Sequence, residues 1–204
     1  MLALAVAPWR AIAAGTRVST GVETEDGAFV IEVDTAVAPV TVANHFAYVN
    51  GHLLEGASVY RVVTLANQTP ETAPRIEVLH WGMNLPDGHA PPFPSIAHET
   101  TRGTGLKHLD GTVSMAHAAP GPAASEFFVC VGDHSELDFG GRRNPDGQGF
   151  EVFGRVVSGQ DVVRALHARG EAQQYLARPV VIRSVRRVAA EYGGRARCSR
   201  QFRV

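Results

Sequence analysis

Short runs of apolar residues at a period of two recur along this chain, and such runs predict β-strands. In the first clear case, Phe29, Ile31 and Val33 alternate with the residues between them, a spacing that a strand produces and a helix does not. A similar run covers residues 18–23, and the Glu-Asp-Gly sequence at 25–27 between the two runs is typical of a tight turn. The two runs therefore predict a β-hairpin.

Further strand-like runs are separated by segments rich in glycine, proline and aspartate. Many short strands with turn sequences between them favour a closed barrel over a parallel sheet, whose strands would be separated by long helical segments. We therefore expect a mainly β fold. The expected strands are residues 58–63, 76–82, 111–116, 126–131, 152–157 and 180–188.

Two segments have helical spacing instead. The first begins at Pro39, a residue type common in the first turn of a helix, and Gly51 occupies the position of a C-terminal cap. Its apolar stripe should cover one mouth of the barrel. The second covers residues 160–167. The apolar positions are Val42, Phe46, Val49 and Leu53 in the first segment, and Val162, Val163 and Leu166 in the second.

The overall composition is that of one folded domain. The chain has 204 residues, of which 45% are apolar and 19% charged, so a single core can be buried. A formal net charge of −1 gives no field that would attract nucleic acid or an anionic membrane. No run approaches the roughly 18 apolar residues that a membrane span needs. We expect no nucleic-acid partner, no membrane span and a monomer.

The two ends of the chain differ from its middle. Residues 1–16 are rich in apolar residues, and we interpret them either as a signal-peptide remnant or as a disordered N-terminus. A signal remnant would indicate a periplasmic or secreted protein; without one, a cytoplasmic protein is expected. Residues 191–204 contain four arginines and predict a disordered, solvated tail. The folded domain should cover residues 17–190.

Four strand-like runs contain a polar or charged residue within apolar sequence. Burial of such a residue is costly unless it has a partner. Arg61 is the clearest example, because a guanidinium stays protonated at any working pH. These runs are therefore the candidate site. They are Val-Tyr-Arg-Val at 59–62, Met-Ala-His-Ala at 115–118, Ser-Glu-Phe-Phe-Val-Cys at 125–130 and Val-Phe-Gly-Arg-Val at 152–156.

The order of these motifs resembles the cyclophilin family of peptidyl-prolyl cis-trans isomerases, over roughly residues 18–188. The family has Phe-His-Arg-Val, Met-Ala-Asn-Ala and Ser-Gln-Phe-Phe where this chain has its first three motifs, and Leu137-Asp138 followed by the fourth motif matches its closing motifs. The resemblance implies an eight-stranded antiparallel closed barrel capped by two α-helices. It also implies an enzyme that isomerises X-Pro bonds in proline-containing polypeptides and assists folding, with no cofactor.

The resemblance assigns roles to individual residues. Arg61 would be catalytic, and Phe128 would form the floor of a pocket for the proline ring. The main chain of residues 116–118 would exchange hydrogen bonds with the substrate backbone. The predicted substrate-binding residues are His80, Ala116, His117, Ala118, Glu126, Phe128, Leu137, Phe150 and Val78, and Glu77 is left outside the site.

The chemistry of X-Pro rotation gives an independent reason to select Arg61. Rotation breaks amide resonance, with a barrier of about 18–20 kcal/mol. In the twisted transition state the prolyl nitrogen regains a lone pair, which a fixed hydrogen-bond donor stabilises more than it stabilises the planar ground state. A guanidinium presents several donors in a rigid plane. No nucleophile, metal or general base is required.

Three substitutions depart from the family pattern. His80 and Glu126 stand where the family has glutamines, and Phe150 stands where many members have a histidine. Glu126 could pair with Arg61 as a carboxylate, which would orient the arginine but also compete with the peptide for its donors. The departures keep a second hypothesis open, a proline-peptide binding or chaperone module with poor turnover. The intact Arg61 and Phe128 favour the enzyme.

Other features suggest little further chemistry. Nine scattered histidines include no His-x-x-x-His pair, and we predict no metal. Cys130 lies in an apolar run and is interpreted as a core residue. The stretch at 140–149 is interpreted as a surface loop, either a plain solvated turn, which we favour, or a loop that biases substrate choice. Glu136 stands where some members have the tryptophan associated with cyclosporin binding, so we expect weak inhibition by that drug.

Overall fold

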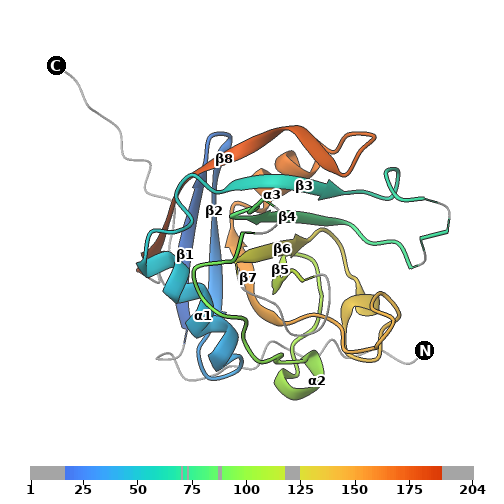
Figure 1. Ribbon diagram of the computed structural model, residues 1–204, viewed down its shortest axis with the longest axis horizontal. Helices are drawn as coiled ribbons and strands as arrows, with labels where there is room; N and C mark the ends of the chain where they lie inside the picture. Colours follow the sequence, from blue (N-terminus) through green and yellow to red (C-terminus); the bar gives the residue numbers. More distant parts are fainter. Residues whose placement is uncertain (1–16, 70, 73, 87–88, 118–124, 190–204) are drawn as a thin grey trace, which may run out of the picture.

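Eight strands form one closed antiparallel barrel in a computed structural model that describes residues 17–69, 71–72, 74–86, 89–117 and 125–189 (Figure 1). The strands neighbour one another in the order β1-β2-β7-β5-β6-β4-β3-β8. The expected barrel is therefore confirmed, whereas the interpretations of residues 1–16 and 191–204 fall outside the described residues. The strands are β1 (Arg17–Thr24), β2 (Gly27–Asp34), β3 (Ser58–Val63), β4 (Val78–Gly82), β5 (Thr112–Met115), β6 (Glu126–Cys130), β7 (Val152–Ser158) and β8 (Tyr175–Val188).

The predicted hairpin is formed by β1 and β2. Thr24 pairs with Gly27 at the turn, and the Thr24 hydroxyl donates a hydrogen bond to the Gly27 carbonyl at 2.7 Å. The alternating residues Phe29, Ile31 and Val33 of β2 are all buried in the core. The period of two in the sequence therefore reports which face of this hairpin points into the barrel.

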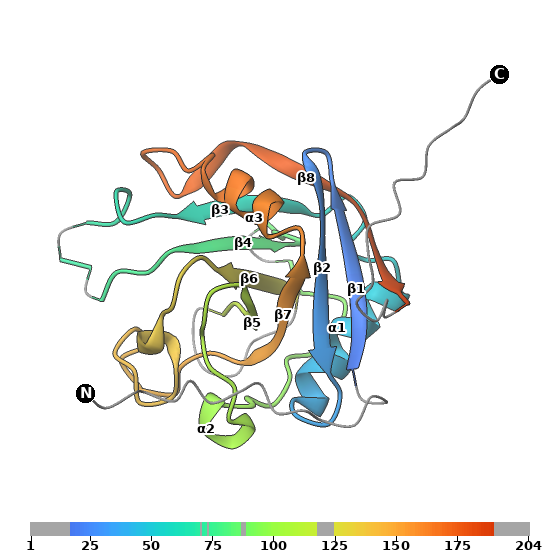
Figure 2. The same ribbon diagram turned by 180° about the vertical axis from the view of Figure 1, so that it is seen from behind.

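Both predicted helices are present. Helix α1 (Pro39–Asn50) follows β2 directly, and helix α3 (Gln160–His167) packs near Gly27 at the other end of that strand (Figures 1 and 2). The two helices therefore lie at opposite ends of β2. The sequence did not predict a third helix, α2 (Thr101–Thr104), because one turn is too short to show a helical period. Among the described residues, no helix is both long enough and apolar enough to cross a membrane.

Strand β8 begins five residues earlier than the sequence pattern predicts. Pro179 lacks a backbone N–H, and a proline usually marks the end of a strand pattern. Here the pairing with β3 shifts register between Val59, which faces Val180, and Arg61, which faces Tyr175. This irregularity accommodates the proline within a continuous strand. It also carries the start of β8 alongside Arg61.

The core is divided into a large cluster inside the barrel and a smaller apolar cluster beneath one side of it. Cys130 belongs to the smaller cluster and is 1% exposed, which confirms its interpretation as a core residue. Burial raises the pKa of its thiol to about 12, so the thiol stays protonated at neutral pH. The smaller cluster comprises Val63, Ile76, Val78, Phe128, Cys130 and Leu137, with Ala116 and Phe150 packed against it.

Candidate functional site

A pocket of about 270 Å³ opens above the smaller apolar cluster. It brings together all of the predicted site residues except Glu126 and Ala118, and Ala118 lies outside the described residues. Strands β3, β4 and β6, the residues that follow β5, the turn that ends at Leu137 and the loop before β7 contribute to it. The lining residues are Arg61, Val63, Ile76, Val78, His80, Ala116, His117, Phe128, Leu137, Arg143, Asn144 and Phe150.

Arg61 is held in this pocket by Gln174, a residue that the sequence analysis did not identify. The Gln174 Oε1 atom accepts hydrogen bonds from Arg61 Nε at 3.0 Å and from Nη2 at 2.5 Å. The Gln174 amide in turn donates to the Asn67 carbonyl at 3.3 Å, and the Val62 amide donates to the Gln174 carbonyl at 2.8 Å. The guanidinium therefore has a fixed orientation. No local pattern marks Gln174, because it meets Arg61 only through the pairing of β8 with β3.

The hypothesis that Glu126 pairs with Arg61 is wrong. Strand pairing places Glu126 opposite Gly82, whereas Arg61 faces His80, two residues away along β4. Two strand residues correspond to roughly 6–7 Å. Glu126 Oε1 instead accepts hydrogen bonds from the Asn84 amide at 2.9 Å and from the Ser125 hydroxyl at 3.2 Å.

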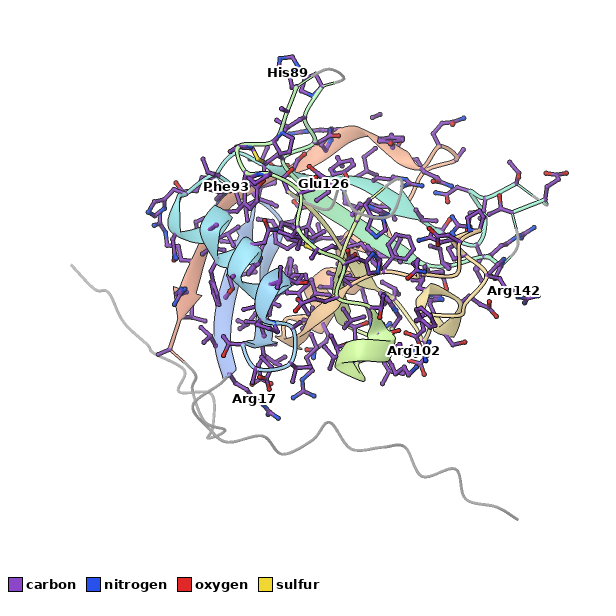
Figure 3. All side chains as sticks on the ribbon, turned by 60° about the horizontal axis from the view of Figure 1, so that its bottom comes forward. Arg17, His89, Phe93, Arg102, Glu126 and Arg142 are labelled. Atoms are coloured by element: carbon purple, nitrogen blue, oxygen red, sulfur yellow. The ribbon has the colours of Figure 1, made fainter. Side chains whose placement is uncertain are left out.

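Glu126 lines a second pocket of about 290 Å³ beside the first. The Glu126 side chain lies on the side of the molecule that carries His89 and Phe93, away from Arg142 (Figure 3). Gly82 has a φ of +152°, and a Cβ atom at this position would lie 2.4 Å from the Glu126 carboxylate. A glycine is therefore required next to Glu126. The second pocket is lined by Tyr60, Asn84, Leu85, His89, Pro91, Ala116, Ser125, Glu126 and Tyr175.

Phe128 forms the aromatic floor of the first pocket and is held by three neighbouring rings. Its ring centroid lies 5.4 Å from Phe150 at 90°, 5.6 Å from His80 at 37° and 5.9 Å from His108 at 11°. His108 is itself fixed, since its ring nitrogens lie 2.8 Å from Asp138 Oδ1 and 3.2 Å from the Ser114 hydroxyl. Phe128 therefore cannot turn without moving its support.

His80 is uncharged at neutral pH. Burial, together with the positive charges of Arg61 and Arg143, lowers the pKa of His80 to about 3. A neutral imidazole carries one N–H donor and one acceptor nitrogen. His80 therefore replaces the hydrogen-bonding capacity of the family's glutamine without adding a third positive charge to the pocket.

The interpretation of residues 140–149 as a solvated turn is wrong at two positions, because Arg143 and Asn144 line the pocket. The Arg143 guanidinium donates to the Pro74 carbonyl at 3.2 Å, and burial together with the charge of Arg61 lowers the pKa of Arg143. Gly149 lets the loop fold back, since a Cβ atom there would lie 2.6 Å from the Leu137 carbonyl. Such long-range packing leaves no signal in the local sequence.

Ala116 lies between the two pockets and lines both of them. Its methyl group leaves the strand surface open to a second chain. The neighbouring His117 side chain is fully buried and lies 4.8 Å from the Phe150 ring, centroid to centroid. An extended peptide that crossed Ala116 could therefore place one residue in each pocket, with Arg61 and Phe128 on the same side.

Comparisons with known proteins agree with this architecture. The family described as "Cyclophilin type peptidyl-prolyl cis-trans isomerase/CLD" matches residues 19–187. A peptidyl-prolyl cis-trans isomerase, cyp18, from Streptomyces antibioticus is 33% identical over 80% of this chain and 94% of its own length. Peptidyl-prolyl cis-trans isomerase A from Dickeya dadantii is 30% identical over 86% and 87%, respectively.

Solved structures show the same fold at lower identity. The crystal structure of a Cryptosporidium parvum cyclophilin type peptidyl-prolyl cis-trans isomerase covers 85% of this chain and 98% of its own, with a TM-score of 0.67 and 14% identity. A second structure of that protein, in the presence of the dipeptide Ala-Pro, has a TM-score of 0.66 and 15% identity, and covers 84% of this chain and 99% of its own.

Proposed function

This chain belongs to the cyclophilin-type peptidyl-prolyl cis-trans isomerase family, and from that premise we propose that Arg61 is the side chain that catalyses X-Pro rotation here. One observation carries the proposal: a guanidinium fixed by Gln174 shares a pocket with the aromatic floor Phe128. The Arg61 side chain needs to supply no covalent chemistry, because rotation only requires loss of amide resonance.

Among the residues that the structure describes, the hydrogen bonds to Gln174 leave Arg61 donors free for the substrate. A guanidinium has five N–H donors, and Gln174 accepts two of them, which leaves three. As the prolyl nitrogen becomes pyramidal, a remaining donor can hydrogen-bond its lone pair, which the planar ground state does not offer. The interaction therefore lowers the barrier instead of only tightening binding.

Such an interaction can supply a large part of the required stabilisation of the transition state. Raising a rate of ~0.01 s⁻¹ to ~100 s⁻¹ takes roughly 5 kcal/mol. Hydrogen bonds to charged groups contribute about 1.5–3 kcal/mol each, and they are stronger in a pocket from which a bound proline excludes water. Arg61 therefore supplies a large part of the effect, and desolvation of the twisted bond by Phe128 supplies a further part.

Substrate binding is divided between the two pockets. The proline ring occupies the pocket over Phe128, with Val78 and Leu137 as apolar wall. The chain before proline crosses Ala116 towards the second pocket, where Glu126 lies. Main-chain recognition of this kind tolerates many side chains. We therefore propose flexible proline-containing polypeptides as the substrate class, with no cofactor.

A protease-coupled assay tests the assignment. Because a related structure was determined in the presence of Ala-Pro, an Ala-Pro peptide is the natural first substrate. The wild-type protein should accelerate isomerisation, and Arg61→Lys should lose most of that acceleration since an ammonium lacks the planar fork held by Gln174. Peptide binding without acceleration by the wild-type protein would instead support the alternative, a binding module on the same barrel.

Two further expectations stay proposals. We propose a monomer, as the sequence analysis expects, and size-exclusion chromatography with light scattering would test it. The compartment depends on residues 1–16, which lie outside the described residues: a signal remnant there would send the protein to the periplasm or outside the cell. Mass spectrometry of the protein from its native host would decide this point.

A further inference from the structure

Three residues of types that bind metal ions, His98, His117 and Glu151, lie close together next to the pocket over Phe128. His98 lies in the loop before α2, His117 follows β5, and Glu151 precedes β7. The Nδ1 atom of His98 lies 3.2 Å from Oε1 of Glu151, and Nε2 of His117 lies 3.0 Å from Oε2 of the same carboxylate. One ligand atom from each residue lies within 4.8 Å of the other two.

The cluster is buried, and in the described part of the chain its polar atoms have no hydrogen-bond partner outside it. The side chains of His117 and Glu151 are fully buried, and that of His98 is 13% exposed. Apart from these two close contacts within the cluster, neither ring nitrogen of either histidine and neither oxygen of Glu151 has a hydrogen-bond partner among the described residues. A buried carboxylate in this state is costly unless a cation sits beside it.

We propose that His98, His117 and Glu151 bind a Zn²⁺ ion. Two imidazole nitrogens and one carboxylate oxygen form a donor set that zinc uses with a water molecule in the fourth position. Zinc bonds of about 2.0–2.1 Å place tetrahedral ligands roughly 3.3 Å apart. Each histidine nitrogen lies close to that separation from a different Glu151 oxygen, His98 Nδ1 at 3.2 Å from Oε1 and His117 Nε2 at 3.0 Å from Oε2. With one ligand atom from each residue within 4.8 Å of the other two, a small side-chain adjustment would bring all three onto one ion.

The sequence prediction of no metal relied on short spacing motifs, which this cluster does not contain. Its ligands come from positions 98, 117 and 151, in three segments that only the folded barrel brings together. A protonated histidine beside Glu151 is the competing explanation for the same contacts. It also neutralises the carboxylate, but it predicts no affinity for metal.

A bound ion would act on the isomerase pocket through direct neighbours. His117 follows Ala116, which lines both pockets, and the His117 ring packs 4.8 Å from Phe150. Phe150 in turn contacts the floor residue Phe128 edge to face at 5.4 Å. Zinc would therefore fix the backbone that receives the peptide. It would also raise stability, since the unfolded chain does not hold these ligands together.

Calorimetry on the full-length, tag-free protein tests the site. After dialysis against EDTA, ZnCl₂ should bind to the wild type at one ion per chain and raise its melting temperature. His98→Ala should weaken binding by more than the roughly 10–100-fold that loss of an outer-shell partner costs. Glu151→Gln should weaken it as much, and Co²⁺ in the wild type should give the visible absorption of a four-coordinate ion.

The control is His52→Ala, because His52 forms an exposed pair with Glu55 at 2.9 Å without a second histidine ligand. This variant should keep wild-type zinc affinity. Circular dichroism of the metal-free variants checks folding, and if Glu151→Gln does not fold, the partly exposed His98→Ala decides. The proposal is overturned if the wild type does not bind zinc at one ion per chain, or if His98→Ala binds it as tightly as the wild type.

Discussion

Replacement of Gln174 by leucine is the sharpest test of how the site is built. Gln174 accepts the Nε and Nη2 protons of Arg61, and leucine has a similar volume but no acceptor. The fold should survive, since the backbone contact of residue 174 with Val62 does not involve the side chain. The Arg61 guanidinium would lose its fixed direction.

The size of the effect follows from the two hydrogen bonds. A hydrogen bond to a charged group contributes about 1.5–3 kcal/mol, and about 1.4 kcal/mol corresponds to a factor of ten in rate. If the orientation of Arg61 matters mainly in the transition state, kcat/KM should fall by at least about tenfold. The loss should appear mostly in kcat, because Phe128 and Ala116 would still bind the peptide.

The measurement is a protease-coupled assay with an Ala-Pro peptide at several substrate concentrations, so that kcat and KM are separated. Gln173→Leu is the matched control, since Gln173 is the exposed neighbour of Gln174 on the same segment. Gln173→Leu should retain wild-type kcat. A Gln174→Leu variant as active as the wild type would refute the claim that this residue positions Arg61.

Three further predictions follow. Arg143 adds a second cation to a pocket without a lining carboxylate, so peptides with glutamate after proline should have a higher kcat/KM than peptides with lysine there. Arg143→Ala should reduce the ratio of these two kcat/KM values. An unchanged ratio would contradict the role of Arg143. Burial lowers the pKa of His45 to about 3. Below about pH 6.5 the unfolded chain binds a proton at His45 that the folded protein does not bind, so the protein becomes less stable as the pH decreases. Urea titrations at pH 7.5 and 5.5 measure the free energy of unfolding, and His45 should account for a decrease of about 1.4 kcal/mol between these two pH values. The decrease should be smaller by that amount in His45→Gln and unchanged in His52→Ala. Cyclosporin should inhibit weakly because Glu136 replaces an aromatic residue; nanomolar inhibition would contradict this.

The barrel could be predicted from the sequence because its strands have one face in the core. Residues such as Phe29, Ile31 and Val33 repeat every second position for that reason alone. The start of β8 could not be predicted, because Pro179 looks like a strand end until the pairing with β3 accommodates it. Helix α2 was missed since it contains a single turn.

Some residues of the candidate site could likewise be predicted from the sequence, and others could not. Arg61 stands within an apolar run, so the sequence marks it as a charged exception that needs an explanation, whereas Phe128 was identified through the resemblance to the family's Ser-Gln-Phe-Phe motif. Gln174 and Arg143 lie in polar segments that resemble any surface loop, and only long-range packing brings them to the pocket. The pairing of Arg61 with Glu126 failed because residue types suggest which charges attract, whereas strand register decides which of them meet.

The most direct test of the central claim is NMR exchange spectroscopy of an Ala-Pro peptide with catalytic amounts of the wild-type protein and of Arg61→Ala. The wild type should interconvert the cis and trans peptide signals rapidly. Arg61→Ala should still shift those signals on binding, while exchange between them falls towards the uncatalysed rate of tens to hundreds of seconds. Undiminished exchange in a correctly folded Arg61→Ala variant would contradict the account.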